Sequence, residues 1–531
     1  MKKGIGLLAL VMACGLFLSA QENFILKTEN YKAYIDRFNA HDHELYEGYI
    51  SNDSAWSFLK DNIPLLDCPD KNLELTYYFR WWTYRKHVKK TPDGFIITEF
   101  LPQVYWSGKY NSINCAASFH IYEGRWLKDN KILTDYARFW FRKGGDLRSY
   151  SAWLVDALWA YHQVKQDKNL LTDLLPDFVD NYQKWETGRS FHGMFIGLNR
   201  DGLFSTVDDR DAMEMSIGGH GKRPSINAYM YGDAVAIAKV AKLAGKQELV
   251  SLYHAKADSL KARTLEKLWD QDAAFFKTLP YNKTELVNVR EIIGYTPWYF
   301  NLPLKNKQYE NAWKYLLSDS GFYAPYGLTT AEQSHPRFEL SYSGHECKWN
   351  GPSWPYSTSI TLTAMANVLN NYEQHVIQPK DYFNQLLIYA NAHRRVDNKG
   401  NVLPWIDEDL NPYTGDWISR TMLEDMGWQD KKGGEERGKD YNHSTFCDLV
   451  ISGLIGLRPQ DGDTVVINPL VPEKTWDWFC LDNINYHGKV LTIVYDRNGK
   501  KYQRGAGLMC FVNGQLKIRS SKIQKLTFSL K

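Results

Sequence analysis

Hydrophobic positions recur at helical spacing through most of the chain. In the segment 223–245, apolar side chains from Ile226 to Ala244 fall on one helical face, and Gly245 supplies a C-terminal stop. The same spacing predicts further helices near residues 72–88, 126–142, 149–165, 169–185, 246–268, 306–317, 355–371, 379–395 and 443–456. Short Val/Ile runs between these helices are missing, which argues against an α/β barrel. The pattern predicts a mainly α fold built from helical hairpins, an (α/α)6 toroid.

Beyond residue 460 the hydrophobic period changes. Apolar residues alternate with polar ones there, as at Leu491 and Ile493, which is typical of strands. The pairs Asn498-Gly499 and Asn513-Gly514 are strong hairpin turns. We therefore expect a small C-terminal β-sandwich domain.

The N-terminal part has a weaker pattern. Residues 21–68 are aromatic and irregular, and possible strands near 94–106 interrupt the helical spacing. The predicted organisation is a signal peptide, a short N-terminal aromatic or β region of uncertain structure, the (α/α)6 domain and the β-domain, at residues 1–20, 21–110, 111–460 and 461–531.

The first twenty residues resemble an export signal. Lys2 and Lys3 precede an apolar run from Ile5 to Leu18, and Ser19-Ala20 offers a cleavage site. The run, of roughly fifteen apolar residues, is short for a transmembrane helix. A lipoprotein signal at Cys14 is the weaker alternative, because the apolar run continues past it. We expect a periplasmic or secreted protein with no membrane span.

Charge and cysteine content exclude several kinds of partner. With 64 basic and 61 acidic residues, the net charge of +3 gives no field that would attract nucleic acid or anionic membranes. The cysteines are far apart and lack a CxxC or His-rich spacing, so the sequence predicts buried thiols, one disulfide at most, no metal and no cofactor. It does not determine the oligomeric state.

The aromatic content is more informative about a partner than the charge or the cysteines. Phe, Trp and Tyr make up 15% of the chain, including 19 tryptophans. Rings beyond the needs of a core often line a groove, where the apolar faces of sugars stack on them. The expected partner is an oligosaccharide or polysaccharide, and a Trp-rich helical core is the alternative explanation.

A cluster of acids lies in the segment 201–221, directly before the helix at 223–245. A carboxyl that protonates a glycosidic oxygen needs an apolar setting or a carboxylate neighbour to stay protonated near neutral pH. Glu214, between two methionines, fits this need, and Asp211 is the other candidate. Arg210 beside them is a candidate for substrate binding. A solvated acidic loop is the alternative.

Two further segments combine aromatic and acidic residues. Trp349 and Trp354 bracket a rigid turn that starts with Asn350-Gly351, which suits either a sugar platform or packing at a helix entry. Glu408 stands between two aspartates, Asp407 and Asp409; one of these carboxylates could activate water, although adjacent acids are also common in exposed turns. Downstream, His443 could bind sugar hydroxyls or be a satisfied histidine at a helix start.

These segments together resemble the clan of inverting α/α-toroid glycosidases that contains trehalases and glycoside hydrolase family 63, including mannosylglycerate-hydrolase-like members. The run Trp349-Asn350-Gly351-Pro352-Ser353-Trp354 is similar to the clan's W-x-G-P-x-W segment, which contributes to the sugar pocket. The stretch from Glu408 to Gly415 is similar to its E-N-Y-N-P-x-T-G segment. The resemblance implies that Glu408 is the general base of an inverting hydrolase. A groove closed by long loops suits exo-action on an oligosaccharide end, so we expect an exo-acting enzyme.

The general acid is less clearly matched. The clan has a G-x-D-x-S-P-R stretch before a helix that starts near Asn-x-Tyr, and here Glu214 falls in the Asp position while the Pro-Arg is absent. The resemblance therefore leaves the acid as either Glu214 or Asp211.

Three other functions remain open at this stage. A polysaccharide lyase on a similar toroid would use Tyr441 and His443 as base and acid. A phosphorylase would replace the base Glu408 with phosphate. A glycan-binding protein without catalysis is the third alternative.

Overall fold

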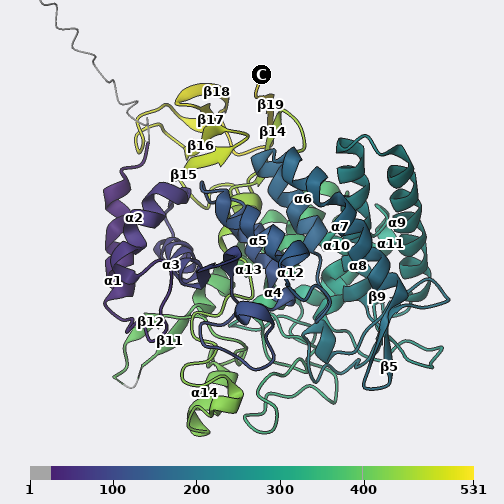
Figure 1. The fold of residues 1–531 in the computed structure, drawn as a ribbon. Helices are drawn as coiled ribbons and strands as arrows, with labels where there is room; N and C mark the ends of the chain where they lie inside the picture. The colour runs from purple at the N-terminus through teal and green to yellow at the C-terminus, as the bar shows by residue number, and fades with distance from the viewer. Residues whose placement is uncertain (1–24, 398) are drawn as a thin grey trace, which may run out of the picture.

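The computed structural model describes residues 25–397 and 399–531, so the predicted signal peptide lies outside the described residues. The described chain is mainly helical, with separate small sheets at its C-terminal end (Figure 1). None of the described helices combines the length and the hydropathy that a bilayer span requires.

Most predicted helices are present, and the structure also contains helices that the spacing did not predict, such as Asn114–Gly124 and Ile418–Asp425. The longer ones are α3 (Lys71–His87), α4 (Asn114–Gly124), α5 (Lys131–Arg142), α6 (Leu154–Lys165), α7 (Lys168–Thr187), α8 (Pro224–Leu243), α9 (Gln247–Lys267), α12 (Pro355–Asn371) and α13 (Pro379–Ala392). The shorter ones are α10 (Thr296–Tyr299), α11 (Lys307–Glu310) and α14 (Ile418–Asp425). Two predictions were too long: 306–317 divides into α11 and a 3-10 helix, Asn311–Leu317, and 443–456 yields the π-helix Leu449–Leu454.

One set of helices forms a continuous series of neighbours: α4 packs on α6, α6 on α8, α8 on α10, α10 on α12, and α12 on the π-helix. Helices α4, α8 and α12 are buried nearly all round, which is typical of helices that face other helices on every side. Helix α9, which packs on α8, buries only a narrow stripe. Helix α3 packs against α13, so the helical body includes a helix from the predicted N-terminal region.

The last helical segment is held against α4 by one carboxylate. Glu123, near the end of α4, accepts hydrogen bonds from the backbone N–H groups of Phe446 (3.1 Å), Cys447 (2.8 Å) and Asp448 (2.8 Å). These N–H groups precede or start the π-helix and would otherwise have no partner inside it. Arg125 adds an ion pair to Asp448 at 2.8 Å. The first and last helices of the series are therefore joined by buried polar contacts.

The C-terminal region forms two antiparallel sheets. One has the order β1-β15-β16-β17-β18 and the other β13-β14-β19. The strands are β13 (Leu457–Arg458), β14 (Thr464–Ile467), β15 (Trp478–Tyr486), β16 (Lys489–Asp496), β17 (Gly507–Val512), β18 (Gln515–Ser520) and β19 (Leu526–Ser529). Asn513-Gly514 makes the expected tight turn, with both φ angles positive (49° and 77°). Asn498-Gly499 lies in the longer loop 497–506 that joins the paired strands β16 and β17, so this hairpin connection is not the expected two-residue turn.

The N-terminal region is helical where an irregular or β region was predicted. It contains α1 (Lys32–Asn39) and α2 (Asn52–Asn62), while the short β1 (Leu65–Asp67) pairs with β15. The aromatic residues that obscured the pattern pack α1 on α3, for example Phe38 against Phe79 with ring centroids 5.4 Å apart. Part of the aromatic surplus is thus core.

Of the strands predicted at 94–106, only β3 (Gly94–Ile97) forms, paired with β2 (Val88–Thr91). The following residues leave the hairpin as a loop. The cysteines of the described chain are all free thiols, and all but Cys347 are buried.

In Figure 1 the C-terminal sheets (yellow) cover one end of the helices. Helix α14 and the hairpin of β11 (Arg394–Val396) and β12 (Val402–Pro404) lie at the opposite end.

Replacement of Glu123 tests the link between α4 and the last helix. We expect Glu123→Gln to lower the free energy of unfolding by roughly 3 kcal/mol, because an amide nitrogen would face buried N–H donors. Thermal unfolding followed by circular dichroism measures the shift. The matched control is Glu248→Gln, an exposed glutamate in the first turn of α9, which should change stability by less than about 0.5 kcal/mol. Equal effects of the two substitutions would show that the contacts of Glu123 are unimportant.

Candidate active site

A cavity of about 230 Å³ is lined by residues from several loops. Its wall contains Glu99, Phe100, Tyr105, Trp106, Ile113, Cys115, Tyr150, Asp209, Arg210, Ala212, Glu214, His345, Glu346, Cys347, Trp354, Glu408, Lys432, Arg437, Tyr441 and His443. The wall thus combines aromatic rings with acids and bases. A larger hollow of about 760 Å³ borders the N-terminal helices, but its carboxylates, Asp67 and Glu74, are both paired with Lys71.

Glu214 lies on the cavity wall in a tight, irregular turn. The residues before and after it in this turn, Ala212 and Met215, have positive φ angles of 57° and 63°. The carbonyl of Glu214 accepts a hydrogen bond of 3.0 Å from the N–H of Trp349. Removal from water raises the pKa of Glu214 to about 8, and the negative charges of Asp209 and Asp208 add to this effect. No cation forms an ion pair with Glu214 among the described residues.

Asp211, the other candidate acid, does not line the cavity. Its side chain is fully buried and pairs with Arg223, whose Nε lies 2.7 Å from Oδ2. The hydroxyl of Ser225, in the first turn of α8, donates to the same oxygen. Asp211 thus ties the acidic loop to the start of α8, and of the two candidates only Glu214 faces the cavity.

Glu408 reaches the cavity from the loop between β12 and α14. Its side chain is 1% exposed and pairs with Arg437 through two contacts, Nε to Oε1 at 2.8 Å and Nη2 to Oε2 at 3.1 Å. The thiol of Cys347 donates to Oε2 at 3.1 Å. Arg437 also pairs with Glu346 at 3.0 Å, so its single positive charge lies between two carboxylates.

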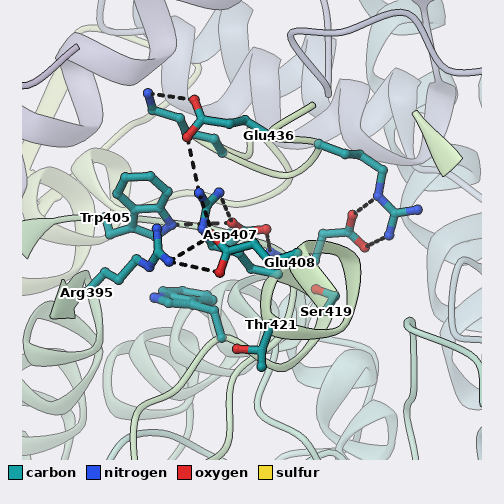
Figure 2. Close-up of polar contacts among 12 residues, drawn as sticks. Arg395, Trp405, Asp407, Glu408, Ser419, Thr421 and Glu436 are labelled. Carbon is teal, nitrogen blue, oxygen red and sulfur yellow. Dashed lines mark hydrogen bonds and ion pairs between the residues drawn. The ribbon is translucent and has the colours of Figure 1, made fainter. Parts of the chain in front are cut away.

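The two acids beside Glu408 have other partners, and Figure 2 shows Asp407 close to Trp405. Asp407 accepts a hydrogen bond from the indole of Trp405 (3.3 Å) and lies 3.6 Å from Arg420. Asp409 accepts from the backbone N–H of Ser419 in the first turn of α14 (3.1 Å). All three acids are buried, so the interpretation of this stretch as an exposed turn was wrong. Only Glu408 lines the cavity.

The tryptophan segment contributes one ring to the cavity rather than two. Trp354 lines the wall, and Trp349 stacks behind it with ring centroids 5.0 Å apart. Asn350 and Gly351 lie outside the lining; Gly351 packs so closely on the carbonyl of Glu339 that a Cβ would come within 2.2 Å of its oxygen. These three residues, which the sequence predicts to bind substrate, thus lie outside the cavity lining.

A pair of backbone hydrogen bonds aligns this segment with the Glu408 loop. Ser353 and Leu410 exchange N–H···O bonds of 2.9 Å in both directions. Trp354 directly follows Ser353, and Glu408 lies two residues before Leu410. The two hydrogen bonds therefore explain why two distant motifs meet at one cavity.

Arg210 and His443, the two other residues predicted to bind substrate, both line the cavity. The guanidinium of Arg210 pairs with Asp209 at 2.8 Å and lies over the ring of Tyr150. His443 contacts the hydroxyl of Tyr441 through Nδ1, whereas its Nε2 is buried with no hydrogen-bond partner. Burial keeps the pKa of His443 well below its usual range, so the ring is neutral.

Glu99 is a third cavity carboxylate that sequence reasoning missed. It follows β3 in a stretch that resembled a strand, and no local acid cluster marked it. Tyr441 donates a hydrogen bond of 2.6 Å to its Oε1. Burial raises the pKa of Glu99 to about 8, an effect that the Tyr441 hydrogen bond opposes and the charge of Glu408 increases. Glu99, Cys115 and His443 bring donor atoms within 4.8 Å of one another, so they are the described residues that could hold a metal ion.

Several solved structures are similar to this chain. A structure named "Sialidase" shares 42% sequence identity over 94% of this chain, with a TM-score of 0.87. The present chain spans only 44% of that protein's length. A glycoside hydrolase family 78 rhamnosidase from Bacillus sp. matches 82% of this chain and 40% of its own, at 11% identity and a TM-score of 0.52, which indicates a shared fold.

A mannosylglycerate hydrolase of glycoside hydrolase family 63 from Thermus thermophilus matches 71% of this chain and 100% of its own, at 11% identity and a TM-score of 0.46. Residues 457–518 match the model of the glycosyl hydrolase family 65 C-terminal domain. Residues 109–444, well over half of the chain, match the model of the mannosylglycerate hydrolase MGH1-like glycoside hydrolase domain. The chain with this cavity therefore belongs to the MGH1-like glycoside hydrolase family.

Proposed function

We propose that the protein is an exported, exo-acting and inverting glycoside hydrolase in which Glu214 is the general acid and Glu408 the general base. The observation that carries this proposal is that the two carboxyl groups enter one cavity from separate loops and differ in their charged partners. An inverting hydrolase needs one carboxyl that gives a proton and another that takes one from water.

The surroundings of Glu214 suit an acid. Its raised pKa, near 8, keeps the carboxyl protonated at neutral pH, and no cation pairs with it among the described residues. A proton held in this way can pass to the glycosidic oxygen as the bond breaks.

The surroundings of Glu408 suit a base. Arg437 compensates its charge and fixes the carboxylate through two contacts. A fixed carboxylate can hold a water molecule by hydrogen bonding and accept its proton when the water attacks the sugar. The roles also agree with the motif positions of the two glutamates.

The size of the cavity supports action at a chain end. Its volume of about 230 Å³ is below the roughly 300–1,000 Å³ of most ligand pockets and suits a single sugar ring. Trp354 offers a face on which the ring can stack, while Arg210 and His443 offer hydrogen-bonding groups for its hydroxyls.

Three further parts of the proposal rest on less direct support. The helix series from α4 to the π-helix, joined through Glu123, is the arrangement that an (α/α)6 toroid requires. Inversion follows from the resemblance of the Glu408 segment to inverting enzymes. Export follows from the basic and apolar pattern of residues 1–20, and fractionation of cells that produce the full chain would test it.

A lyase mechanism is less well supported by the same cavity. Tyr441 would have to act as base, but burial and the nearby Glu99 raise its pKa well above the ordinary value. Its hydroxyl is also engaged with Glu99 and His443.

Replacement of the proposed base is the first test of the function. We expect Glu408→Gln to lower kcat by about 100-fold to 10,000-fold, because the amide cannot accept a proton from water. Turnover of aryl glycosides and reducing oligosaccharides, after a panel has identified a substrate, measures the loss. Glu435→Gln, an exposed glutamate in a neighbouring loop, is the matched control and should turn over normally. Full activity of Glu408→Gln would exclude the base role, and activity restored by phosphate alone would indicate a phosphorylase.

The proposed acid predicts a pH dependence. Because Glu214 must be protonated to act and its pKa is about 8, we expect kcat/KM to fall as the pH rises through about 8. Glu214→Gln should abolish this alkaline limb and slow poor leaving groups far more than nitrophenolates, which leave without a proton. A variant that loses both substrates equally, or keeps the alkaline limb, would contradict the assignment.

The reaction products test inversion and exo-action together. We expect proton NMR at early times to show a monosaccharide of the anomeric configuration opposite to that of the bond cleaved. Chromatography should show this sugar together with chains one residue shorter, and no internal fragments, at early times. Early release of internal fragments would exclude exo-action, and a product that retains its configuration would exclude a single displacement.

A further inference from the structure

Three buried side chains of different chemistry converge on the cavity wall. Glu99, Cys115 and His443 are each exposed by 3% or less, and one donor atom from each lies within 4.8 Å of the other two. Oxygen, sulfur and nitrogen donors are thus available at one point. The three residues also line the cavity from which a substrate would approach.

The backbone holds these side chains together from distant parts of the sequence. The N–H of Asn442, next to His443, donates to the carbonyl of Glu99 at 3.1 Å. The carbonyl of Asn442 contacts the ring of His120 at 2.6 Å, and His120 lies on α4, the helix that begins beside Cys115. Asn442 therefore links the segments that carry all three donors.

The contacts within the cluster leave donor capacity unused. Cys115 Sγ lies 3.8 Å from Glu99 Oε2, a long and weak hydrogen bond, and Nδ1 of His443 lies 3.3 Å from Glu99 Oε1, while its Nε2 has no hydrogen-bond partner among the described residues. Glu99 has no Lys or Arg ion pair among the described residues, although it shares the cavity with the carboxyls of Glu214 and Glu408. A divalent cation would supply the missing positive charge.

The donor set identifies the class of cation. Ca²⁺ and Mg²⁺ prefer oxygen ligands alone, whereas Zn²⁺ accepts thiolate, imidazole and carboxylate in one tetrahedral site. Zinc sites that act on substrates have three protein ligands and an open fourth position.

We propose that Glu99, Cys115 and His443 bind a zinc-class divalent cation whose fourth position opens into the cavity and takes a sugar hydroxyl. The Cys115 proton is released when the thiolate binds the cation. The role of the fourth position rests on the proposed function, but binding of the cation does not. Tyr441, which donates to Glu99, holds that carboxylate in place.

Zinc binding to the full-length protein tests the site directly. After dialysis against a chelator, titration with Zn²⁺ followed by calorimetry and elemental analysis should show one tightly bound ion per chain. We expect Cys115→Ser and His443→Gln each to weaken binding by at least about 100-fold. Cys347→Ser is the matched control, because this thiol lines the same cavity outside the cluster, and its Zn²⁺ affinity should equal that of the wild type.

A measurement on the wild type avoids reliance on variants that fold poorly. Co²⁺ should produce a thiolate-to-cobalt absorption band, and the monosaccharide product should shift the visible cobalt bands. Glu214→Gln, which removes the proposed acid without breaking an ion pair, should lose activity on poor leaving groups yet bind Zn²⁺ normally, which separates the two proposals. Failure of the wild type to bind Zn²⁺, or a cobalt complex without the thiolate band, would overturn the site, and visible bands unaffected by the sugar would overturn the open position.

Discussion

The buried ion pair between Glu408 and Arg437 is the interaction on which the arrangement of the cavity depends. Both side chains are 1% exposed, and the cost of removing two charges from water is offset only when the geometry is close and the remaining polar atoms have partners. Arg437 meets this condition through its contacts with Glu408 and Glu346. Loss of one partner would leave a buried charge, at a cost of about 3–5 kcal/mol. The loop that carries Arg437 must therefore fold onto the Glu408 loop before the cavity has its shape.

Close backbone approach makes this pairing possible. Gly438, next to Arg437, has a φ of 82°, and a Cβ there would lie 2.0 Å from Oδ1 of Asp407. On the other side of the loop, the reciprocal bonds between Ser353 and Leu410 bring Trp354 alongside. In the acidic stretch 407–409, Asp407 and Asp409 accept hydrogen bonds from the protein's own donors. Glu408 is the acid of this stretch that faces the cavity. The helices provide the rigid base for these loops, and Glu123 joins the first and last of the series.

The cavity separates carboxyl groups by their surroundings rather than by their type. Burial raises the pKa values of Glu214 and Glu99, whereas Glu408 lies beside Arg437, whose charge it shares with Glu346. One cavity therefore holds carboxyls with and without a paired cation, a difference that acid and base catalysis can use. Membership of a glycoside hydrolase family indicates that these carboxyl groups act in glycoside hydrolysis. The donor atoms of Glu99, Cys115 and His443 indicate a candidate site for a metal ion in the same cavity.

The sequence by itself determined the helices, the C-terminal sheets and the position of Glu408, because helical and strand spacing and short motifs depend on neighbouring residues. Helix α12 matches its predicted range, 355–371, residue for residue. Only the tertiary structure decided which acid of the 201–221 loop faces the cavity. The chain reverses between Asp211 and Arg223, and the resulting ion pair turns Asp211 away from the cavity. The tertiary structure also decided that α1 packs on α3 and that Glu99 joins Tyr441 and His443. The contacts of Glu99 link residues more than 300 positions apart, and burial and charge at such distances depend on packing that no local pattern records.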